Sequence, residues 1–289
     1  MSFGQNVNIP DPNFKASLLS NPNINTNGDT EIQVSEASSY DDILGCFSCQ
    51  ISDLTGVEYF ENVTNMQFDQ NLLTSADFSG CAALESLSLY SNNLTSINIS
   101  QNQRLKSLDV MSNDLTAINL TNNDSLVLLN LITNNIESLD LSQNGFLEVL
   151  YCFNNNLTSL DVSQNNNLIF LNVSSNPISC LNVRNGNNMN FDNLNQNYEF
   201  GAINCPNLFC IQVDDAEWST VNWTFIDPQT SFSEDCNNDC TSSLTELTSS
   251  KTLIQILDLM GHETSFKPNI PLIYVYDDGT SEKVFTIED

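Results

Sequence analysis

The sequence contains very few positively charged side chains. Seven lysines and arginines stand against 36 aspartates and glutamates, which gives a formal net charge of −29 at pH 7. A surface with this charge repels the phosphates of nucleic acids and anionic membrane headgroups, and it attracts cations. The composition therefore argues against nucleic acid and against an anionic membrane surface as partners.

The sequence also lacks the side chains from which most catalytic sites are built. His262 is the only histidine, so the repeated part of the chain described below cannot hold a Ser–His–Asp or Cys–His arrangement. There is no glycine-rich loop of the kind that binds phosphates. A carboxylate pair such as Asp214 or Asp215 with Glu217 leaves a glycosidase-like site as an alternative. We expect a protein that is not an enzyme and requires no cofactor.

Long hydrophobic runs are absent as well. No segment approaches the roughly 20 apolar residues that a membrane-spanning helix needs, so we expect no membrane insertion. The first ten residues, Met1–Pro10, are polar and show no charged and then apolar leader. If the protein is exported, its signal peptide is absent from this chain.

A pattern that recurs every 21 residues dominates the middle of the sequence. Its blocks begin at Val63, Leu84, Leu105, Leu126, Leu147 and Leu168. The pattern, LxxLxLxxNxLxxLxL, resembles the leucine-rich repeat, and with irregular ends it covers residues 51–214. The resemblance implies a horseshoe-like solenoid. Each coil contributes a short strand to a parallel sheet on the concave face, with an extended segment on the convex side and little helix.

One asparagine recurs in each block, shortly after the predicted strand. The six residues are Asn71, Asn92, Asn113, Asn134, Asn155 and Asn176. A buried amide is tolerated only where its hydrogen-bonding groups are satisfied. We therefore expect a buried column of asparagines that bond the backbone of neighbouring coils.

Residues that alternate with the strand leucines point away from the core, toward the concave face. They are mostly polar in the early coils and apolar or aromatic later. The candidate partner-binding residues are Tyr90, Met111, Leu128, Ile132, Val149, Tyr151, Phe153 and Phe170. A contiguous apolar patch typically marks an interaction site, so we expect a protein or peptide partner, with a glycan or a second copy of the chain as alternatives. The other interpretation is that some of these side chains turn inward or lie under the irregular segment Met189–Gly201.

Nine cysteines fall into two groups. Cys81, Cys152 and Cys180 lie inside repeats, where we expect them to be buried apolar fillers. Cys46, Cys49, Cys205, Cys210, Cys236 and Cys240 cluster at the two ends of the solenoid. The spacing of Cys46 and Cys49 also suits zinc or a redox pair, but we expect disulfides formed in an oxidising compartment. Our preferred bridge joins Cys210 to Cys236.

Residues 1–50 form an N-terminal cap. The stretch Pro10–Leu19 predicts a short helix, with Asp11 in its first turn beside a proline. The following segment, Asn25–Glu36, resembles a calcium loop of the EF-hand or dockerin type. This resemblance implies Ca²⁺ bound by four side chains: Asn25, Asn27, Asp29 and Glu36. The alternative is a polar cap that shields the first coil.

Residues 215–243 are expected to form a C-terminal cap and a linker. Leu208–Val213 predicts the last strand of the solenoid, and Met189–Gly201 predicts one irregular coil. Trp218, Trp223 and Phe225 are expected to plug the open end of the core. The alternative is that an exposed tryptophan forms a platform for sugars.

Residues 244–289 have a different pattern, in which apolar residues alternate over 253–259, 272–276 and 283–287. This predicts a small all-β domain with a hairpin turn at Asp277–Thr280. The strings Lys251–Glu263, Pro271–Gly279 and Lys283–Phe285 resemble the C-terminal sorting domain (type A-like) of type IX secretion cargo. The resemblance implies that the secretion machinery exports the protein across the outer membrane of a Gram-negative bacterium, usually with cleavage of the tail.

Together these features predict a secreted or cell-surface recognition or adhesion module that binds a protein partner. A polysaccharide-binding protein and a structural component of a surface layer or matrix are the alternatives. The sequence does not identify the ligand.

Overall fold

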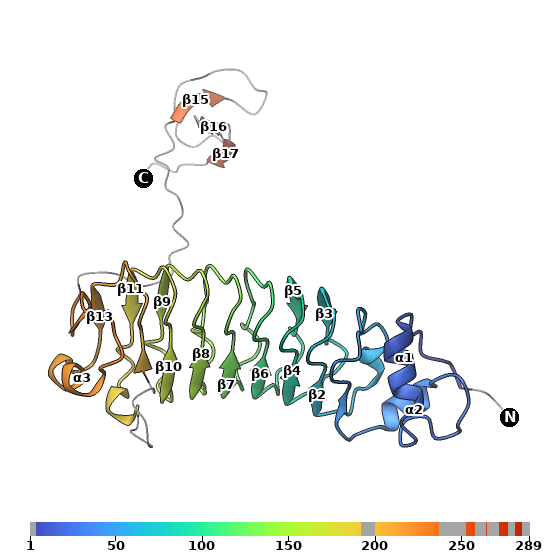
Figure 1. Ribbon diagram of the computed structural model, residues 1–289. Coiled ribbons are helices and arrows are strands. Elements are labelled where there is room, and N and C mark those ends of the chain that lie inside the picture. Colours follow the sequence, from blue (N-terminus) through green and yellow to red (C-terminus); the bar gives the residue numbers. More distant parts are fainter. Residues whose placement is uncertain are drawn as a thin grey trace. The chain divides into compact units, whose positions relative to one another are not determined.

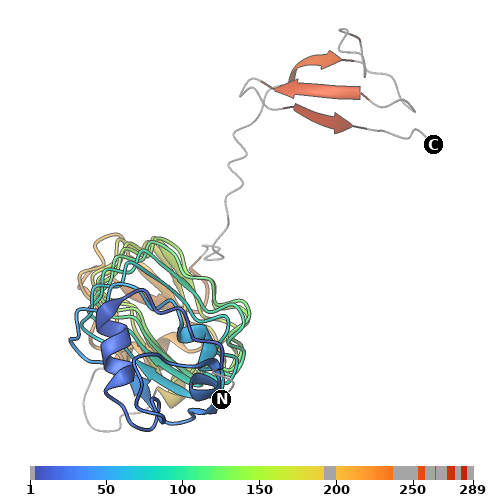
Figure 2. The same ribbon diagram turned by 90° about the vertical axis from the view of Figure 1, so that its right-hand side faces the viewer.

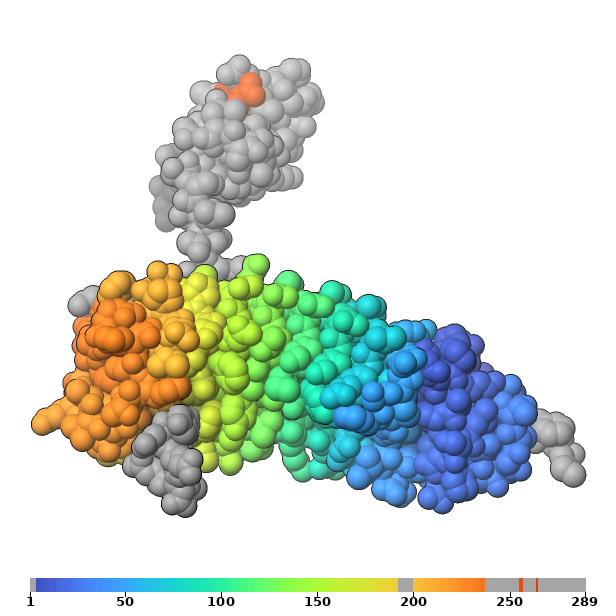
Figure 3. Space-filling view, in the orientation of Figure 1, coloured from blue at the N-terminus to red at the C-terminus, as the bar shows by residue number. Residues whose placement is uncertain are grey.

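The structure, a computed structural model, describes residues 4–191, 200–236, 253–257, 264, 272–276 and 281–284. The chain divides into two compact units, Met1–Ser242 and Ser243–Asp289. The first unit is an elongated stack of coils, and successive coils follow one another in sequence order from one end to the other (Figures 1 and 3). Within the described residues, no helix has the length and apolar character that crossing a membrane requires.

The N-terminal cap contains two short helices, α1 (Pro12–Leu19) and α2 (Val34–Ser39), before the first strand, β1 (Leu44–Gly45). Asp11 begins α1, since its Oδ1 accepts hydrogen bonds from the backbone N–H groups of Asn13 and Phe14, both at 2.9 Å. Phe14 is fully buried and packs edge-on against Phe68 of the first regular coil, with ring centroids 5.7 Å apart. The cap therefore closes the N-terminal end of the core.

Eight short strands form a continuous parallel sheet along one side of the stack. After β1 they are β2 (Asn65–Gln67), β4 (Ser86–Ser88), β6 (Ser107–Asp109), β7 (Leu128–Asn130), β8 (Val149–Tyr151), β10 (Phe170–Asn172) and β12 (Phe200–Gly201), in that spatial order. From β2 to β10, each residue pairs with the residue 21 positions later, as Leu108 does with Leu129. The 21-residue period is therefore one turn of the solenoid.

A second set of strands runs along the other side of the coils (Figures 1 and 2). One sheet pairs β3 (Ser75–Asp77) with β5 (Ser96–Asn98), and another contains β9 (Ser159–Asp161), β11 (Cys180–Asn182), β13 (Cys210–Gln212) and β14 (Ser231–Ser233). The prediction that Leu208–Val213 is the last strand is wrong. β14 pairs with β13 and extends the sheet by one more coil.

Three further short helices lie between strands: the 3-10 turns η1 (Val57–Tyr59) and η2 (Asn188–Asn190), and α3 (Ala216–Asn222). The described residues of the first unit thus form a parallel-strand solenoid with little helix. This confirms the predicted leucine-rich-repeat architecture.

The predicted asparagine column is present. Asn134 shows its chemistry: its Nδ2 donates to the carbonyl oxygens of Val110 at 2.9 Å and Leu131 at 3.1 Å, and its Oδ1 accepts from the N–H of Leu115 at 3.0 Å. A residue with positive φ precedes each asparagine; the series is Gln70, Ser91, Ser112, Thr133, Asn154 and Ser175. This left-handed residue turns the chain after each strand, and the asparagine side chain then bonds the turn.

A second asparagine column was not predicted. It contains Asn102, Asn123, Asn144 and Asn165, of which the most exposed is 1% accessible. Each Nδ2 donates to two backbone carbonyls of the preceding coil, as Asn123 does to Ile99 and Asn102, both at 3.0 Å. No hydrogen-bond partner of the four Oδ1 atoms lies among the described residues. Each regular coil therefore has buried asparagine side chains at two places, and both bond the backbone of the neighbouring coil.

Aromatic rings close the C-terminal end of the first unit. Trp223 is 5% exposed and stacks on Phe200, with centroids 4.1 Å apart and planes 11° from parallel. Trp218 is partly buried against the same core. The expectation of a core plug is therefore correct for Trp223. The alternative of a sugar platform is wrong for this residue, because its ring is not accessible.

The two ends of the solenoid carry disulfides. One joins Cys46 to Cys49 and another joins Cys210 to Cys236, with Cα atoms 5.8 Å apart in each pair. Cys81, Cys152 and Cys205 are buried free thiols. The prediction for Cys180 is wrong: it is disulfide-bonded and partly accessible, not a buried filler. Its position at the start of β11, on the surface of the sheet, allows it to reach a partner thiol.

The second unit contains an antiparallel sheet with the order β15 (Leu253–Leu257), β16 (Leu272–Tyr276), β17 (Ser281–Val284). Leu257 pairs with Ile273 and Leu272 pairs with Val284. The predicted hairpin turn Asp277–Thr280, together with Cys240 and His262, lies outside the described residues. The assignment of a complete small all-β domain stays a prediction.

Candidate protein-binding face

The outward side chains of the eight-stranded sheet form three columns that cross the coils. We call this surface the eight-stranded face. The first column contains Asn65, Ser86, Ser107, Leu128, Val149 and Phe170; the second contains Gln67, Ser88, Asp109, Asn130, Tyr151 and Asn172. The third follows the strands and contains Asp69, Tyr90, Met111, Ile132, Phe153 and Ser174. The first column changes from polar to apolar at Leu128, and the second is polar except for Tyr151. In the third column the residues between Asp69 and Ser174 are apolar or aromatic.

All eight predicted partner-binding residues lie on this face and are partly accessible. None belongs to the buried core or to the partly buried residues packed against it. Neighbouring strands bring Leu128, Val149 and Phe170 side by side. The rings of Tyr151 and Phe170 are in contact, with centroids 4.5 Å apart. We call Leu128, Ile132, Val149, Tyr151, Phe153 and Phe170 the apolar patch; in the described structure its members turn outward.

Sequence reasoning missed one aromatic residue of this face. Phe47 is 60% exposed, and its ring lies 6.4 Å from that of Tyr90. The backbone N–H groups of Cys46 and Ser48 donate to Gln67 and Asp69, which places Phe47 in the third column. Cys49 then occupies the position of the column asparagine, and Asn71 accepts its N–H. Ser48 has a positive φ, as the residue before the asparagine has in later coils. Because Cys49 stands where those coils have asparagine, the sequence pattern does not identify this coil.

Two carboxylates mark the polar half of the face. Asp69 is 9% exposed, and its Oδ1 accepts from Ser88 Oγ at 2.5 Å and from the N–H of Tyr90 at 3.0 Å. Asp109 accepts from the N–H of Met111 at 3.0 Å and from Asn130 Nδ2 at 3.1 Å. Burial raises the pKa of the Asp109 carboxyl above its ordinary value, and the charge of Asp69 adds to the rise. Asp109 lies on β6, next to β7 of the apolar patch, and Asp69 lies two coils further away.

The predicted calcium loop is bonded internally. Oε1 of Glu36 accepts from the N–H of Thr26 at 2.9 Å and of Asn27 at 3.3 Å, and Oε2 accepts from the N–H of Gln33 at 3.0 Å. Asn25 Oδ1 accepts from the N–H of Gly28, Asn27 Oδ1 from that of Asp29, and Asp29 Oδ1 from that of Glu31. The four side chains named as calcium ligands therefore satisfy the backbone of their own loop.

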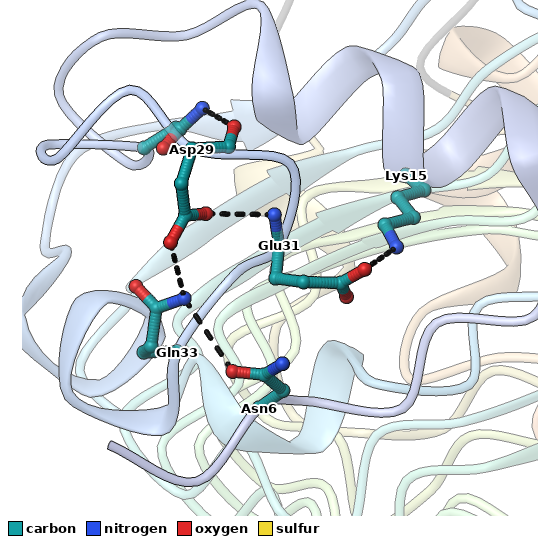
Figure 4. A network of polar contacts seen from close by, with 6 residues as sticks. Asn6, Lys15, Asp29, Glu31 and Gln33 are labelled. Atoms are coloured by element: carbon teal, nitrogen blue, oxygen red, sulfur yellow. Dashed lines mark hydrogen bonds and ion pairs between the residues drawn. The ribbon is translucent and has the colours of Figure 1, made fainter. Parts of the chain in front are cut away.

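Further contacts tie this loop to its surroundings. Gln33 Nε2 donates to Asp29 Oδ2 at 3.2 Å, and Lys15 of α1 pairs with Glu31 at 2.7 Å (Figure 4). Glu36 also completes a capping box at the start of α2. Among the residues that the structure describes, no group of three or more histidine, cysteine or acidic side chains is placed to hold a metal. The arrangement agrees with the polar-cap alternative, and calcium binding stays a prediction.

The other candidate sites have structural partners. The disulfide between Cys46 and Cys49 leaves neither thiolate free to bind zinc. Asp214 accepts hydrogen bonds from the backbone N–H groups of Gly186 and Asn188. Asp215 is the N-cap residue of α3, and its side chain accepts from the N–H of Trp218. Asp214 and Asp215 therefore stabilise the turn and the helix in which they lie.

Comparison with known proteins gives similarity to solved leucine-rich-repeat structures. No protein-family model and no curated protein sequence matches the chain. The functional domain of InlJ from Listeria monocytogenes, which includes a cysteine ladder, is 23% identical with a TM-score of 0.40; the match covers 74% of this chain and 58% of that one. A leucine-rich-repeat protein from Leptospira interrogans is 19% identical with a TM-score of 0.38, covering 63% of this chain and 57% of that one. Internalin C2 from L. monocytogenes is 15% identical with a TM-score of 0.41, covering 74% and 99%. The chain thus spans less than two thirds of the length of the first two.

Proposed function

We propose that this chain is a non-enzymatic recognition or adhesion module that binds a protein partner through the eight-stranded face. The observation that carries the proposal is the apolar patch, in which Leu128, Val149 and Phe170 lie side by side on β7, β8 and β10 and the Tyr151 ring contacts that of Phe170. A hydrophobic surface rimmed by polar groups favours a partner that buries it. Aromatic residues such as Tyr151, Phe153 and Phe170 are those that most often dominate binding free energy.

A glycan partner is supported less well. Sugars require free polar groups beside an aromatic ring, and Tyr151 has Asn130 and Asn172 on either side. The Asn130 amide already bonds Asp109 and the N–H of Ile132, and the Oδ1 of Asn172 accepts the N–H of Ser174. Most of these polar groups are therefore already hydrogen-bonded within the sheet. The patch suits a protein surface or peptide better.

The double substitution of Tyr151→Asn and Phe153→Ser tests this proposal. Neighbouring coils carry Asn172 and Ser174 at the equivalent positions, so the fold is expected to persist. Partner binding should weaken about a thousandfold, because each of the two lost aromatic anchors is worth about 2 kcal/mol. Affinity capture with the full chain, followed by titration of each retained protein, measures the effect.

Phe146→Ser provides the matched control. Phe146 is 64% exposed and lies before β8, outside the three columns. A partner that is retained by the wild type and by this control, and is lost from the double variant, supports the proposal. Equal retention by all three proteins places binding elsewhere. Loss of the circular dichroism spectrum in the double variant shows that the rings belong to the core.

We further propose that residues 244–289 direct export by the type IX machinery and that the protein acts outside the cell. Support comes from the sequence resemblance and from the separate compact unit Ser243–Asp289 with its antiparallel strands. The disulfides of the first unit are typical of proteins in an oxidising compartment. Secretion or display on the outer surface of a Gram-negative bacterium agrees with both features.

Deletion of residues 244–289 tests the sorting assignment. Expressed with a signal peptide in a Gram-negative strain that has the type IX machinery, the truncated protein is expected to remain soluble in the periplasm. Immunoblots of periplasm, cell surface and medium measure its distribution, with the full chain as the control. Truncated protein at the surface or in the medium at full-chain levels would falsify the assignment.

A further inference from the structure

The polar half of the eight-stranded face combines acidic charge with a deficit of cations. Asp69 and Asp109 belong to β2 and β6 or follow them, and the strand between them is β4. The ion pairs of the described residues include neither carboxylate. The nearest basic side chains in the sequence, Arg104 and Lys106, both pair with Glu85, at 3.3 and 2.7 Å. The face therefore presents negative charge that the described chain does not neutralise.

An aromatic ring completes this acidic half. Tyr90 follows β4, so it lies in the coil between Asp69 and Asp109, and it is partly accessible. Ser88 pairs with Asp109 on the neighbouring strand, and its Oγ donates to Asp69. A guanidinium or ammonium group above Ser88 would therefore face both carboxylates, with Tyr90 two residues further along the same side. Carboxylates attract such a group directly, and an aromatic face adds a cation–π contribution. This combination suits arginine or lysine better than a neutral side chain.

The apolar patch begins directly beside this acidic half. Leu128 on β7 pairs with Ser107 on β6, and Tyr151 on β8 is two strands from Asp109. With strands about 4.8 Å apart, the distance across the face from the acidic half to Tyr151 is about 10–15 Å. An extended polypeptide covers this distance with three or four residues, at about 3.3 Å per residue.

We propose that the eight-stranded face binds an extended polypeptide segment in which an arginine or lysine is three or four residues from an aromatic or aliphatic anchor. The basic side chain occupies the space between Asp69, Asp109 and Tyr90, and the anchor contacts Val149, Tyr151 and Phe170. This inference rests on the proposed function and adds the chemistry of the partner. Charge complementarity selects the basic residue, since the formal net charge of the chain is −29.

Synthetic peptides test the inference directly. Twelve-residue peptides with blocked ends contain one arginine, a spacer of one to six serines and glycines, and a Leu-Ser-Phe anchor. In a matched set, glutamate replaces the arginine. Binding to the full chain is measured by isothermal titration at low and at physiological salt. We expect arginine peptides with a spacer of two or three residues to bind at least about tenfold more tightly than glutamate peptides, with the difference reduced by salt.

Substitutions then assign the charge effect to residues. Asp109→Asn is structurally conservative, because Asn130 and Asn172 occupy the equivalent positions and accept the same backbone hydrogen bond. Asp69→Asn together with Asp109→Asn is expected to weaken arginine peptides about tenfold or more and to leave glutamate peptides no weaker. Asp140→Asn together with Asp161→Asn is the control of equal charge change, because Asp161 holds the same position one coil later and accepts the equivalent backbone hydrogen bond. Asp140 lies outside the three columns, and Asn119 and Asn182 hold its position in other coils.

The outcomes separate this inference from the proposed function. Equal affinities of arginine and glutamate peptides, or no effect of the two aspartate substitutions, overturn the inferred chemistry. If such binding still requires Tyr151 and Phe153, the proposed function stands. Binding that is unaffected by Tyr151→Asn and Phe153→Ser overturns both. Failure of every peptide to bind at 1 mM overturns the extended-segment inference, while capture of a folded partner through the same two rings retains the proposed function.

Discussion

Replacement of Asn134 by alanine is expected to lower the free energy of unfolding by about 2–5 kcal/mol. Asn134 is 7% exposed, and its Oδ1 accepts the N–H of Leu115. Its Nδ2 donates to the carbonyls of Val110 and Leu131, which also accept from Asn113 and Asn155. The substitution therefore leaves one buried N–H without its acceptor, at about 1–3 kcal/mol, and removes one of two hydrogen bonds from each carbonyl, at about 0.5–1 kcal/mol each. Thermal and denaturant unfolding measure the loss, and hydrogen exchange at the Leu115 amide locates it.

Asn135→Ala is the matched control for this substitution. Asn135 is exposed, and its backbone N–H, which donates to Leu115, is unchanged by the substitution. We expect a change within about 0.5 kcal/mol, as for most surface substitutions. Equal destabilisation by the two variants, or unchanged exchange at Leu115 in the Asn134 variant, contradicts the role assigned to the asparagine column.

The regular coils were predictable because each repeats the same local solution. An apolar residue at every inward strand position, an asparagine after it and a fixed 21-residue period leave one way to bury the apolar side chains. The direction of the side chains on the eight-stranded face follows from the same alternation, so Tyr151 and Phe153 could be placed outside the core from the sequence alone. The periodicity contains no information about which partner binds this face.

The features that escaped prediction depend on contacts that the period does not specify. Helix α2 is six residues long, and its capping box involves Gln33 and Glu36, which the sequence pattern presented as part of a calcium loop. In the C-terminal coils, β14 lies 21 residues after β13, and Cys210 pairs with Ser231. Phe232 is the one residue of β14 that keeps the apolar character of the pattern, so the sequence signal for this strand is weak. Tertiary packing therefore decided these segments where the local signal was weak.

The second asparagine column was missed for another reason. Asn123 and its equivalents recur at the same 21-residue period as the first column, yet they fall among many other asparagines in the turns. Composition alone does not separate a buried amide from an exposed one. Burial of Asn102, Asn123 and their neighbours becomes evident only once coils are stacked, because their acceptors are carbonyls of the preceding coil.

Trp223 makes the second large contribution to stability that we can test. Its replacement by alanine is expected to lower the free energy of unfolding of the C-terminal coils by about 3–5 kcal/mol, as for other buried aromatic side chains. Besides the stack on Phe200, the ring lies 5.1 Å from Phe191 and 5.8 Å from Phe232. Coils contact mainly their neighbours, so hydrogen exchange should accelerate in β12, β13 and β14 before it changes in β2 and β4.

Two companion variants make this result specific. Val221→Ala changes a 71% exposed residue of α3, the helix that ends directly before Trp223, and is expected to alter stability by no more than about 0.5 kcal/mol. Trp223→Phe keeps an aromatic ring and removes Nε1, which has no hydrogen-bond partner within the described residues. Its cost is expected to be about 1–2 kcal/mol, below that of alanine, because the unsatisfied donor disappears along with part of the ring. A uniform rise in exchange along all coils of the alanine variant contradicts a local plug, and it requires instead that the solenoid unfolds as one cooperative unit.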